Sequence, residues 1–452
     1  MPEKQLILAL DIGSSSVRAS LYTDAAKPVR GAAVRVERSF AASRDGGSVL
    51  DADAAVDDVI RAIDELLAKT EDIKGDITHI AASAFWHSIV GVDAKGRPTT
   101  KVLGWADTRS REFTAKLKKK FDEAAVHDRT GAHFHSSYWP AKLLWLQKES
   151  KAVFDKTSRW LSFSDLVLER LTGVSRTSIS MASGTGIFNI HTLRWDAPMM
   201  KALKIKPDHL TPVTVSDDES FALTKKFQER WPRLKAAKMF PAIADGAADN
   251  VGSGCTTKQK AALMIGTSGA MRIVYKGDPP KHIPAGIWCY RVDRRRTVIG
   301  GALSNGGNLY AWMIKNLRLP KNAEDLAAER PNGAKGVTFM PYLAGERSTG
   351  YNEDAKGAIL GLTMANDAID ILQAGLEAVA AQFADIHSRL KKVANIREIY
   401  ASGGALHDSP VWTAMISAAI GKQLELTGIA EASSCGVVLL ALETLGKIDD
   451  IG

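Results

Sequence analysis

The chain has 452 residues, of which 45% are hydrophobic and 24% charged, an ordinary balance for a soluble globular protein that is too long for one core. No apolar run approaches the roughly eighteen residues of a membrane helix, and three cysteines without CxxC spacing indicate neither a disulfide framework nor a zinc site. The net charge of +8 is mild for this length, so we expect a cytoplasmic protein that binds anionic small molecules and neither nucleic acid nor membrane.

The first predicted structural unit spans residues 6–22, which read LILALDIGSSSVRASLY. An apolar strand runs into four small residues at positions 13–16, and a second strand follows. A tight turn of this kind presents backbone N–H groups and hydroxyls to an anion such as phosphate. Asp11 lies just before the turn and would repel a phosphate without a cation between them, so the pattern favours a Mg²⁺ site at Asp11. The alternative is that Asp11 only caps the turn.

Residues 29–40 predict a third strand, and residues 53–69 predict a helix because their apolar side chains recur on one helical face. Two further strands, residues 77–83 and a segment that ends near Leu103, run into aromatic and polar side chains. Ligands bind just beyond the carboxyl ends of strands in open α/β sheets, so these side chains form a candidate polyol pocket. They are Trp86, His87, Trp105, Asp107 and Arg109.

The segment from residue 110 to residue 240 is mainly helical in its spacing, with predicted helices over 112–121 and 142–149. The loop between them contains His133 and His135, which suit either a metal pair or the lining of a pocket. Since no third ligand lies nearby, the pattern favours pocket lining. The small, polar block SISMASGTG at 178–186 predicts tight packing near a sugar or a hinge.

The second half of the chain repeats the first turn. Residues 262–275 read ALMIGTSGAMRIVY, which is again a strand, a turn of small residues and a returning strand. Aligned without gaps, the two stretches pair Ile12 with Ile265, Gly13 with Gly266, Ser14 with Thr267, Ser15 with Ser268 and Tyr22 with Tyr275. The tetrapeptide GTSG alone is typical of an ordinary hairpin turn, but its repetition predicts two hairpins that hold one phosphate chain between two lobes.

The remaining segments contain two more sites rich in small residues. Residues 298–307 read VIGGALSNGG, and their glycines, Gly306 among them, suit the close approach of the backbone to a ligand. Gly403, Gly404 and Ala405 follow a predicted strand and leave room for an adenine or its ribose. The predicted elements are a helix at 366–393 with Asn366 as its N-cap, strands at 396–401 and 423–427, and a helix at 433–445.

Together these turns resemble the FGGY carbohydrate kinases, a family of the actin/hexokinase/Hsp70 superfamily of two-lobed ATPases. The likeness runs from Ile7 to Lys447, and its phosphate and adenosine motifs match residues 11–16, 266–269 and 403–405. The resemblance implies an α/β fold in which each lobe is a duplicated ribonuclease-H-like mixed sheet with flanking helices, divided into residues 1–242 and 243–452. It also implies ATP and Mg²⁺ as cofactors and a small sugar or sugar acid as partner, and it is compatible with a homodimer.

The resemblance also assigns roles to single residues. Asp245 stands where the family keeps its catalytic base, counted back from Gly266, with Asp249 as the alternative. The predicted nucleotide-binding residues are Gly13, Ser14, Ser15, Arg18, Gly266, Thr267, Ser268, Gly306, Gly403, Gly404 and Ala405. The predicted substrate-binding residues are Trp86, His87, Asp107, Arg109, His135 and Asp245, and the predicted metal-binding residue is Asp11.

Within the family, the chain is most similar to FGGY-type gluconokinases. The likeness rests on WADTRS at 105–110, on HS at 87–88, on His135 and on YLAGER at 342–347. It implies transfer of the γ-phosphoryl group of ATP to D-gluconate, with Arg109, His87 and His135 near the substrate carboxylate. The departures are Trp86 in place of the usual Met, a different loop at 136–139, and a last residue some tens of positions earlier than usual. The alternatives are a xylulokinase or other pentulose kinase, a sugar-responsive repressor, and a non-catalytic actin- or Hsp70-like ATP-binding module.

Overall fold

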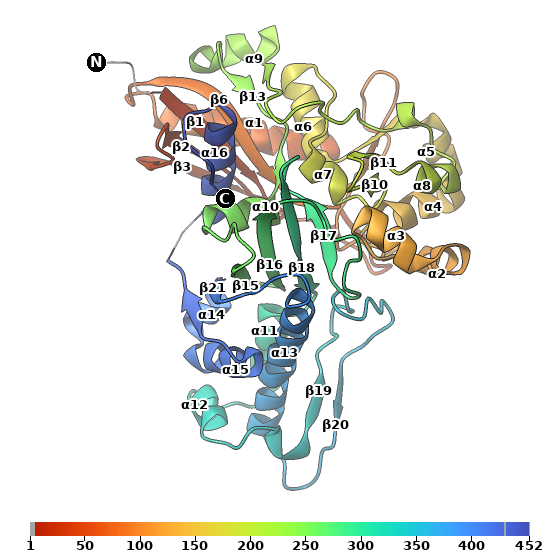
Figure 1. Cartoon of the computed structure of the whole chain (residues 1–452), viewed down its shortest axis with the longest axis vertical. Coiled ribbons are helices and arrows are strands. Elements are labelled where there is room, and N and C mark those ends of the chain that lie inside the picture. The colour runs from red at the N-terminus through yellow and green to blue at the C-terminus, as the bar shows by residue number, and fades with distance from the viewer. Residues whose placement is uncertain (1–4, 429–430, 452) are drawn as a thin grey trace.

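The computed structural model describes residues 5–428 and 431–451, which form two lobes (Figure 1). The first lobe is organised around a sheet with the strand order β12-β13-β6-β1-β2-β3, in which β14 also pairs with β6. Its strands are β1 (Gln5–Ile12), β2 (Ser16–Thr23), β3 (Pro28–Glu37), β6 (Asp76–Ala84), β12 (Phe221–Ala222), β13 (Lys238–Met239) and β14 (Ile243–Ala244). The strand β1 is antiparallel to β2 and parallel to β6, so the sheet is mixed.

The second lobe repeats this arrangement with the strand order β17-β18-β16-β15-β21-β22. Its strands are β15 (Lys260–Ile265), β16 (Gly269–Lys276), β17 (Trp288–Arg291), β18 (Arg296–Leu303), β21 (Glu398–Ser402) and β22 (Leu424–Leu426). The strand β15 is antiparallel to β16 and parallel to β21, as β1 is to β2 and β6. Ile12 and Ile265 are the last residues of β1 and β15, so the repeat predicted from the two turns is confirmed.

In the described part of the chain, helices and four small sheets surround the two large sheets. The helices of the first half are α1 (Ala52–Lys69), α2 (Arg111–Lys120), α3 (Glu123–Thr130), α4 (Trp139–Glu149), α5 (Lys151–Lys156), α6 (Phe163–Thr172), α7 (Ile179–Ser183), α8 (Ala197–Ala202), α9 (Lys225–Arg230) and α10 (Asp245–Gly252). Those of the second half are α11 (Gly307–Asn316), α12 (Ala323–Ala328), α13 (Ala368–Leu390), α14 (Gly404–Asp408), α15 (Pro410–Ile420) and α16 (Ala432–Thr444). The small sheets contain β4 (Ala41–Ala42), β5 (Ser48–Leu50), β7 (Val90–Val92), β8 (Val102–Leu103), β9 (Arg159–Leu161), β10 (Phe188–Asn189), β11 (Arg194–Trp195), β19 (Thr338–Met340) and β20 (Ala358–Leu360).

The start of α13 differs from the prediction by one residue. The N-cap is Asp367, whose side chain accepts hydrogen bonds from the backbone N–H groups of Ile369 and Asp370, and the predicted cap Asn366 is wrong. The side chain of Asn366 instead accepts from the backbone N–H of Thr363. A carboxylate at the cap also stabilises the positive end of the helix dipole, and Arg330 holds the Asp367 carboxylate in place.

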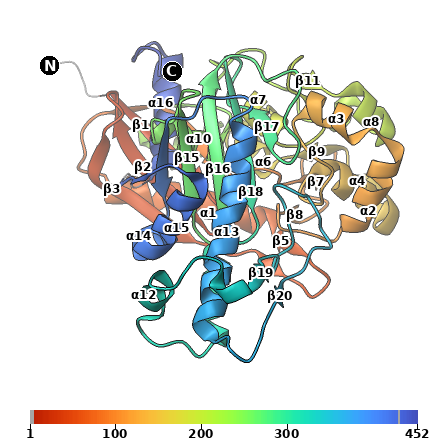
Figure 2. The same cartoon turned by 60° about the horizontal axis from the view of Figure 1, so that its bottom comes forward.

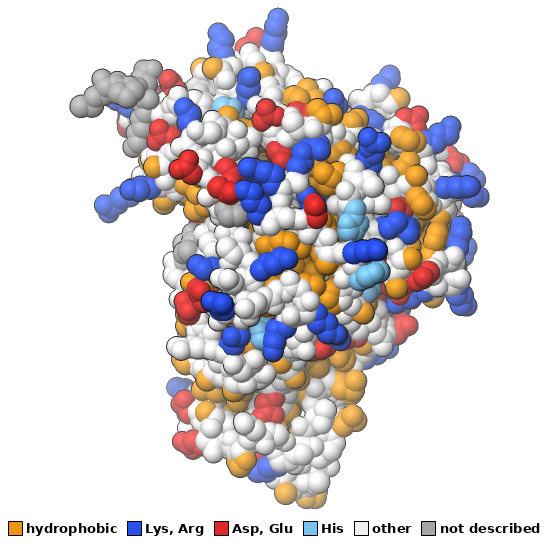
Figure 3. Space-filling model, in the orientation of Figure 1, with side chains coloured by type: hydrophobic (Ala, Val, Ile, Leu, Met, Phe, Trp, Pro, Cys, Tyr) orange, Lys and Arg blue, Asp and Glu red, His pale blue; other side chains and the backbone are white. Residues whose placement is uncertain are grey.

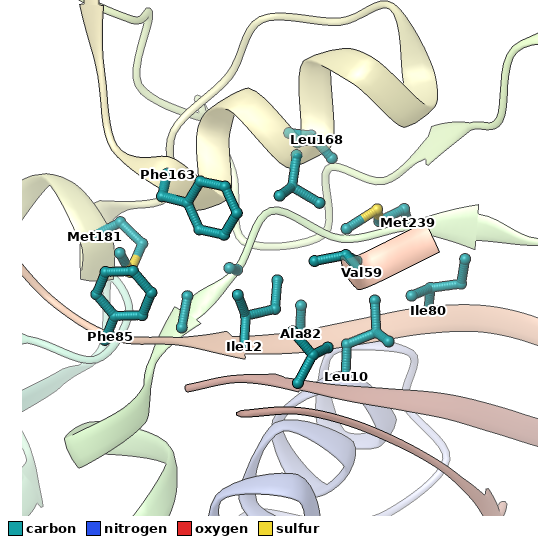
Figure 4. Close-up of a cluster of buried hydrophobic side chains, with 14 of the residues drawn as sticks. Leu10, Ile12, Val59, Ile80, Ala82, Phe85, Phe163, Leu168, Met181 and Met239 are labelled. Carbon is teal, nitrogen blue, oxygen red and sulfur yellow. The ribbon is translucent and has the colours of Figure 1, made fainter. Parts of the chain in front are cut away.

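The core of the first lobe fixes the end of β1. Leu10 and Ile12 are fully buried and pack with Val59 of α1, Ile80 of β6 and Phe163 of α6 (Figure 4). Burial of each such side chain contributes about 1.5–3 kcal/mol relative to exposure. The core therefore holds the strand in place up to the residue that precedes the first predicted phosphate turn.

The last helix, α16, crosses back to the first lobe. It packs against β1, β6 and α10, and the views in Figures 1 and 2 both show it beside β1 and α10. The strand β14, residues 243–244, pairs with β6 and so continues the first sheet. Elements from both sides of residues 242 and 243 therefore build the first lobe. The predicted division at this point stays a prediction.

The surface charge on the visible face is mixed in sign, and the cysteines form no disulfide. Acidic and basic side chains are interspersed over the face that Figure 3 shows. The cysteines at positions 255, 289 and 435 are free thiols. Within residues 5–428 and 431–451, no helix combines the length and the apolarity needed to cross a membrane.

Candidate active site

The second predicted phosphate turn, which spans residues 266–268, separates two cavities. The backbone N–H of Gly266 donates to the carbonyl of Ser268 at 3.0 Å, which closes the turn. The start of α11 supports it from outside, since the N–H of Gly307 donates to the Gly266 carbonyl at 2.9 Å. Thr267 borders both a cleft of about 730 Å³ and a second pocket of about 620 Å³. A phosphate chain that extends from the second pocket past this turn would therefore reach the cleft.

The second pocket contains most of the residues predicted to bind the nucleotide in this lobe. Its lining includes Gly266, Thr267, Gly307, Tyr310, Glu324, Gly404, Ala405 and Trp412. Gly403, which precedes Gly404, has a φ of +102°. A Cβ at this position would be 2.2 Å from the carbonyl oxygen of Ile265, so only glycine fits. Gly306 packs against the backbone of Ser268 in the turn itself, at 2.9 Å from an ideal Cβ. Gly306 therefore allows close approach of two segments of the protein backbone, whereas the prediction was close approach to a ligand.

The first predicted phosphate turn is held by an arginine that the sequence analysis did not single out. Arg38 follows β3, which ends at Glu37, three residues earlier than predicted. Its guanidinium donates to the carbonyl of Gly13, with Nε at 2.9 Å, while the N–H of Gly13 donates to Ser16. Ser14 and Ser15 line a cavity of about 260 Å³ beside this turn.

Carboxylates gather in a pocket of about 200 Å³ next to that turn. Asp11, Arg18, Asp249, Gly403 and Glu431 are among its lining residues. Arg18 donates to Asp11 at 3.4 Å and to Glu431 at 3.1 Å, so this predicted nucleotide ligand bridges two acids. Burial raises the pKa of Asp11, and the nearby charges of Glu431 and Asp249 raise it further. A cation in this pocket would relieve that repulsion.

Asp245, the predicted base, is the first residue of α10. The backbone N–H of Gly246 donates to its Oδ1 at 2.7 Å. Burial raises the pKa of Asp245 to about 7, an effect opposed by Arg272 and increased by Asp11 and Asp249. A carboxyl group with a pKa near neutrality suits a general base. Asp249, by contrast, is ion-paired with Arg272 at 2.7 Å, which makes it the weaker candidate.

Trp86 packs over Gly246, the residue that follows Asp245, and its ring stacks on that of His87 with the centroids 6.1 Å apart. An ideal Cβ on Gly246 would lie 3.0 Å from the ring of Trp86, so the ring leaves no space for a side chain there. The Nε1–H of Trp86 donates to the Ser180 carbonyl at 3.1 Å. His87 donates through Nδ1 to the carbonyl of Gly184 at 2.5 Å, and burial lowers its pKa to about 3. The neutral imidazole therefore presents Nε2 as a hydrogen-bond acceptor.

The block at 178–186 thus packs tightly against two of the predicted substrate residues, through the carbonyl groups of Ser180 and Gly184. His87 has a φ of +68°, a backbone conformation that is uncommon for a residue other than glycine. Strained positions of this kind persist where the surrounding structure fixes them, and they cluster at functional sites.

The predicted pair Asp107 and Arg109 has a different arrangement from the one expected. Asp107 is 1% exposed and accepts hydrogen bonds from the Arg109 guanidinium at 2.6 and 3.0 Å and from the Ser48 N–H at 3.1 Å. The guanidinium of Arg109 also lies 4.6 Å from the ring centroid of Trp145. Neither side chain lines the cleft, and their charges neutralise each other instead. The expectation that Arg109 meets a substrate carboxylate stays a prediction, and its ion pair with Asp107 weakens it.

The side chains that do line the cleft include Trp105, His135, Arg347 and Glu353. His133, two residues from His135, accepts a hydrogen bond from the Gly286 N–H and stacks on His127 instead. The two predicted histidines therefore point to different partners. Arg347 belongs to the YLAGER segment, which the sequence analysis used only as a likeness.

Arg272 was missed although a signal was present. It is the one charged residue inside the apolar run of β16 before Lys276, and such a position requires partners within the fold. The partners are Asp249 and Asn250 of α10, the helix that begins with Asp245.

The family follows from comparison with known proteins. Residues 6–251 match the N-terminal domain and residues 261–444 the C-terminal domain of the FGGY family of carbohydrate kinases. The chain belongs to this family. A gluconokinase of Bacillus subtilis (strain 168) is 28% identical over 469 residues, which cover 98% of this chain and 88% of the relative.

Two solved structures have the same fold as this FGGY kinase. A gluconate kinase and a ligand-bound xylulose kinase, both from Lactobacillus acidophilus, each superpose with a TM-score of 0.90 at 26% identity. Each alignment covers 99% of this chain and 91% of the other. The predicted two-lobed α/β fold and the predicted family are therefore confirmed.

Proposed function

We propose that this FGGY kinase is a gluconokinase, which transfers the γ-phosphoryl group of ATP to D-gluconate and releases 6-phosphogluconate. The observation that carries the kinase chemistry is the buried Asp245 carboxyl at the start of α10, on which the carboxylates of Asp11 and Asp249 act electrostatically. Gluconate is supported by the names of the similar proteins and by the WADTRS and YLAGER segments.

Asp245 acts as the general base in this proposal. A sugar hydroxyl is a weak nucleophile, so a carboxylate within hydrogen-bond reach takes its proton as the phosphoryl group is transferred. The pKa of about 7 places Asp245 partly ionised at neutral pH and makes it a stronger base than an ordinary aspartate. His87 accepts a hydrogen bond from a second hydroxyl through Nε2 and so orients the sugar.

The two small-residue turns bind the phosphates of ATP. Their backbone N–H groups and hydroxyls donate to oxygens on which negative charge is spread during transfer. Asp11 and Asp249 would hold Mg²⁺, since both line one pocket and carboxylate oxygens are its preferred protein ligands. Mg²⁺ binds with few protein ligands and several waters, so two carboxylates fit it, and the ion supplies charge neutralisation when bound.

Substitution of Asp11 by Ala should raise the Mg²⁺ concentration needed for half-maximal turnover, because the ion loses one of its two anchors. A Mg²⁺ titration of the initial rate at saturating ATP and gluconate measures this. Asp24→Ala, an exposed carboxylate in the loop after β2, is the matched control and should titrate as the wild type does. If the Asp11→Ala curve overlays the wild-type curve, Asp11 is not a metal ligand.

The substrate is tested by ADP release with gluconate, xylulose, ribulose and glycerol as acceptors. We expect the highest kcat/KM with gluconate. A higher value with xylulose would favour a pentulose kinase, the second candidate, because the xylulose kinase of Lactobacillus acidophilus superposes as well as the gluconate kinase does. No ADP release with any of the four acceptors would contradict both.

A further inference from the structure

Arg38 places a cation against the backbone of the first predicted phosphate turn. Its guanidinium donates to the Gly13 carbonyl through Nε at 2.9 Å and also through Nη2. The guanidinium carbon lies 5.6 Å from the ring centroid of Phe85 and 5.2 Å from that of Phe163, so two aromatic side chains hold the charge in place. Among the described residues, Gly13 is the only hydrogen-bond acceptor for this side chain.

The charge of Arg38 is not neutralised by an ion pair. Burial lowers the pKa of Arg38 to about 10, and the charges of Asp58 and Asp11 oppose this effect. Neither of these carboxylates forms an ion pair with it, nor does any other within the part of the chain that the structure describes. Its Nη1 is buried and makes no hydrogen bond. A desolvated cation costs free energy unless polar groups meet it, so the contact with the turn carbonyl compensates for part of this cost.

The hydrogen bonds of Arg38 fix the direction of the peptide group between Gly13 and Ser14. This peptide bond is trans, so its C=O and its N–H point in opposite directions. With the carbonyl on the guanidinium, the Ser14 N–H points away from Arg38, and it meets no acceptor among the described residues. The backbone N–H of Arg38 also donates to the Ser15 carbonyl at 3.0 Å. The turn therefore keeps an unused N–H donor beside the cavity of about 260 Å³ that Ser14 and Ser15 line.

The second predicted phosphate turn meets a positive group at the matching carbonyl. Gly266 matches Gly13 in the repeat, and its carbonyl accepts from the N–H of Gly307, the first residue of α11, at 2.9 Å. The N-terminus of a helix carries a partial positive charge. The Thr267 N–H, which matches that of Ser14, also meets no acceptor in the described chain. Each half of the protein thus places positive charge behind the same peptide group, the first with a side chain and the second with a helix.

We infer that Arg38 is a positioning residue of the first turn, which aims the Ser14 N–H at a phosphate oxygen and strengthens it as a donor. A cation on a carbonyl oxygen polarises the peptide group, and hydrogen bonds linked in this way strengthen one another. This inference rests on the proposed function, since the phosphate is one of those of ATP. Arg38 itself does not touch the nucleotide in this role, because it acts through the peptide group between Gly13 and Ser14.

The test compares three substitutions of Arg38. Arg38→Gln keeps an N–H donor for the Gly13 carbonyl without the charge, Arg38→Lys keeps both, and Arg38→Met keeps neither. Removal of a donor to a developing oxyanion costs roughly 10²- to 10³-fold in rate, and the loss of Arg38 only weakens one. We therefore expect kcat/KM for ATP to fall roughly 10- to 100-fold in Arg38→Gln and Arg38→Met, and much less in Arg38→Lys. KM for gluconate should not change.

The matched control is Arg30→Met, at an exposed arginine of the same strand β3, which should behave as the wild type does. Selective isotopic labelling of the serine amides gives a readout that a role in stability alone would not move. ATP should shift the Ser14 amide proton downfield in the wild type and in Arg38→Lys, and less in Arg38→Gln, because a stronger hydrogen bond deshields the proton. Thermal unfolding shows which variants fold, and Arg38→Gln with Arg38→Lys carries the test if Arg38→Met does not.

The outcomes separate this inference from the proposed activity. Equal kinetic changes in Arg38→Gln and Arg38→Lys, or a Ser14 amide resonance that ATP leaves in place, would overturn the role of Arg38 while the kinase activity stands. Absence of ADP release by the wild type would overturn the activity. Calorimetric binding of ATP that weakens in Arg38→Gln and not in Arg38→Lys would then still support the role of Arg38. A wild type that binds no ATP would overturn both.

Discussion

Asp245→Asn should lower kcat by roughly 10²- to 10⁴-fold, the usual contribution of a general base, while the affinity for ATP stays near normal. Asparagine keeps the size of the side chain and its hydrogen bond from the Gly246 N–H but cannot take a proton from the sugar hydroxyl. Steady-state kinetics at saturating gluconate measure kcat, and calorimetric titration measures ATP binding. Near-wild-type turnover in this variant, together with an inactive Asp249→Asn, would move the base to Asp249.

The pH dependence of the wild type follows from the same group. Asp245 must be ionised to act, so kcat/KM should fall about tenfold for each pH unit below its pKa of about 7. The raised pKa also means that the folded protein binds the proton more tightly than the unfolded chain does. The contribution of this carboxyl to stability is therefore favourable at acidic pH and is lost as the pH rises from about 4 to about 7.

Asp245→Asn should accordingly be more stable than the wild type above pH 7, and this advantage should shrink toward pH 4, where the wild-type carboxyl is neutral. Thermal unfolding at both pH values measures the difference in Tm. A difference that does not change with pH would mean that the Asp245 carboxylate is not desolvated in the folded protein.

The duplicated framework was predictable because its signals are local. An apolar strand, a turn of small residues and a second apolar strand together predict a hairpin, and Ile12 and Ile265 end their strands at the matching position. The capping error at α13 arose because Asn366 and Asp367 are both good caps in sequence. The choice between them depends on Arg330, which approaches from another segment and pairs with Asp367.

The roles of the arginines were less predictable, because the partners of a charged side chain determine whether it is available to a ligand. Asp107 and Arg109 are only two residues apart, and this spacing brings them into an ion pair that removes both from the cleft. Arg347 is 238 positions beyond Arg109, and only the fold shows that it lies against Trp105 with no ion-paired carboxylate among the described residues. Sequence motifs identify such a residue as part of a family pattern without assigning what it binds.

The crossing of α10 and α16 is a further feature that only the fold reveals, and it supports the base directly. The two helices meet at small residues, where an ideal Cβ on Gly436 would lie 1.9 Å from the carbonyl oxygen of Ala248 and 2.9 Å from the nitrogen of Gly252. The reciprocal contact exists at Gly252, whose Cβ would lie 1.9 Å from the carbonyl oxygen of Ala432. Real Cβ atoms do not approach backbone atoms so closely, so any side chain at either position must separate the helices.

Gly436→Ala should therefore lower the free energy of unfolding by about 1–3 kcal/mol, the usual cost of overpacking. The intrinsic preference of a helix interior for alanine, about 1 kcal/mol, acts in the opposite direction and is outweighed. Displacement of α10 also moves Asp245 at its first residue, and a shift of about 1 Å in a catalytic group can cost roughly 10²-fold in kcat. Cys435→Ala, which adds no volume at the neighbouring position, is the matched control. Urea unfolding and kcat measured at low temperature test both effects, and wild-type values in Gly436→Ala would show that α16 does not position the base.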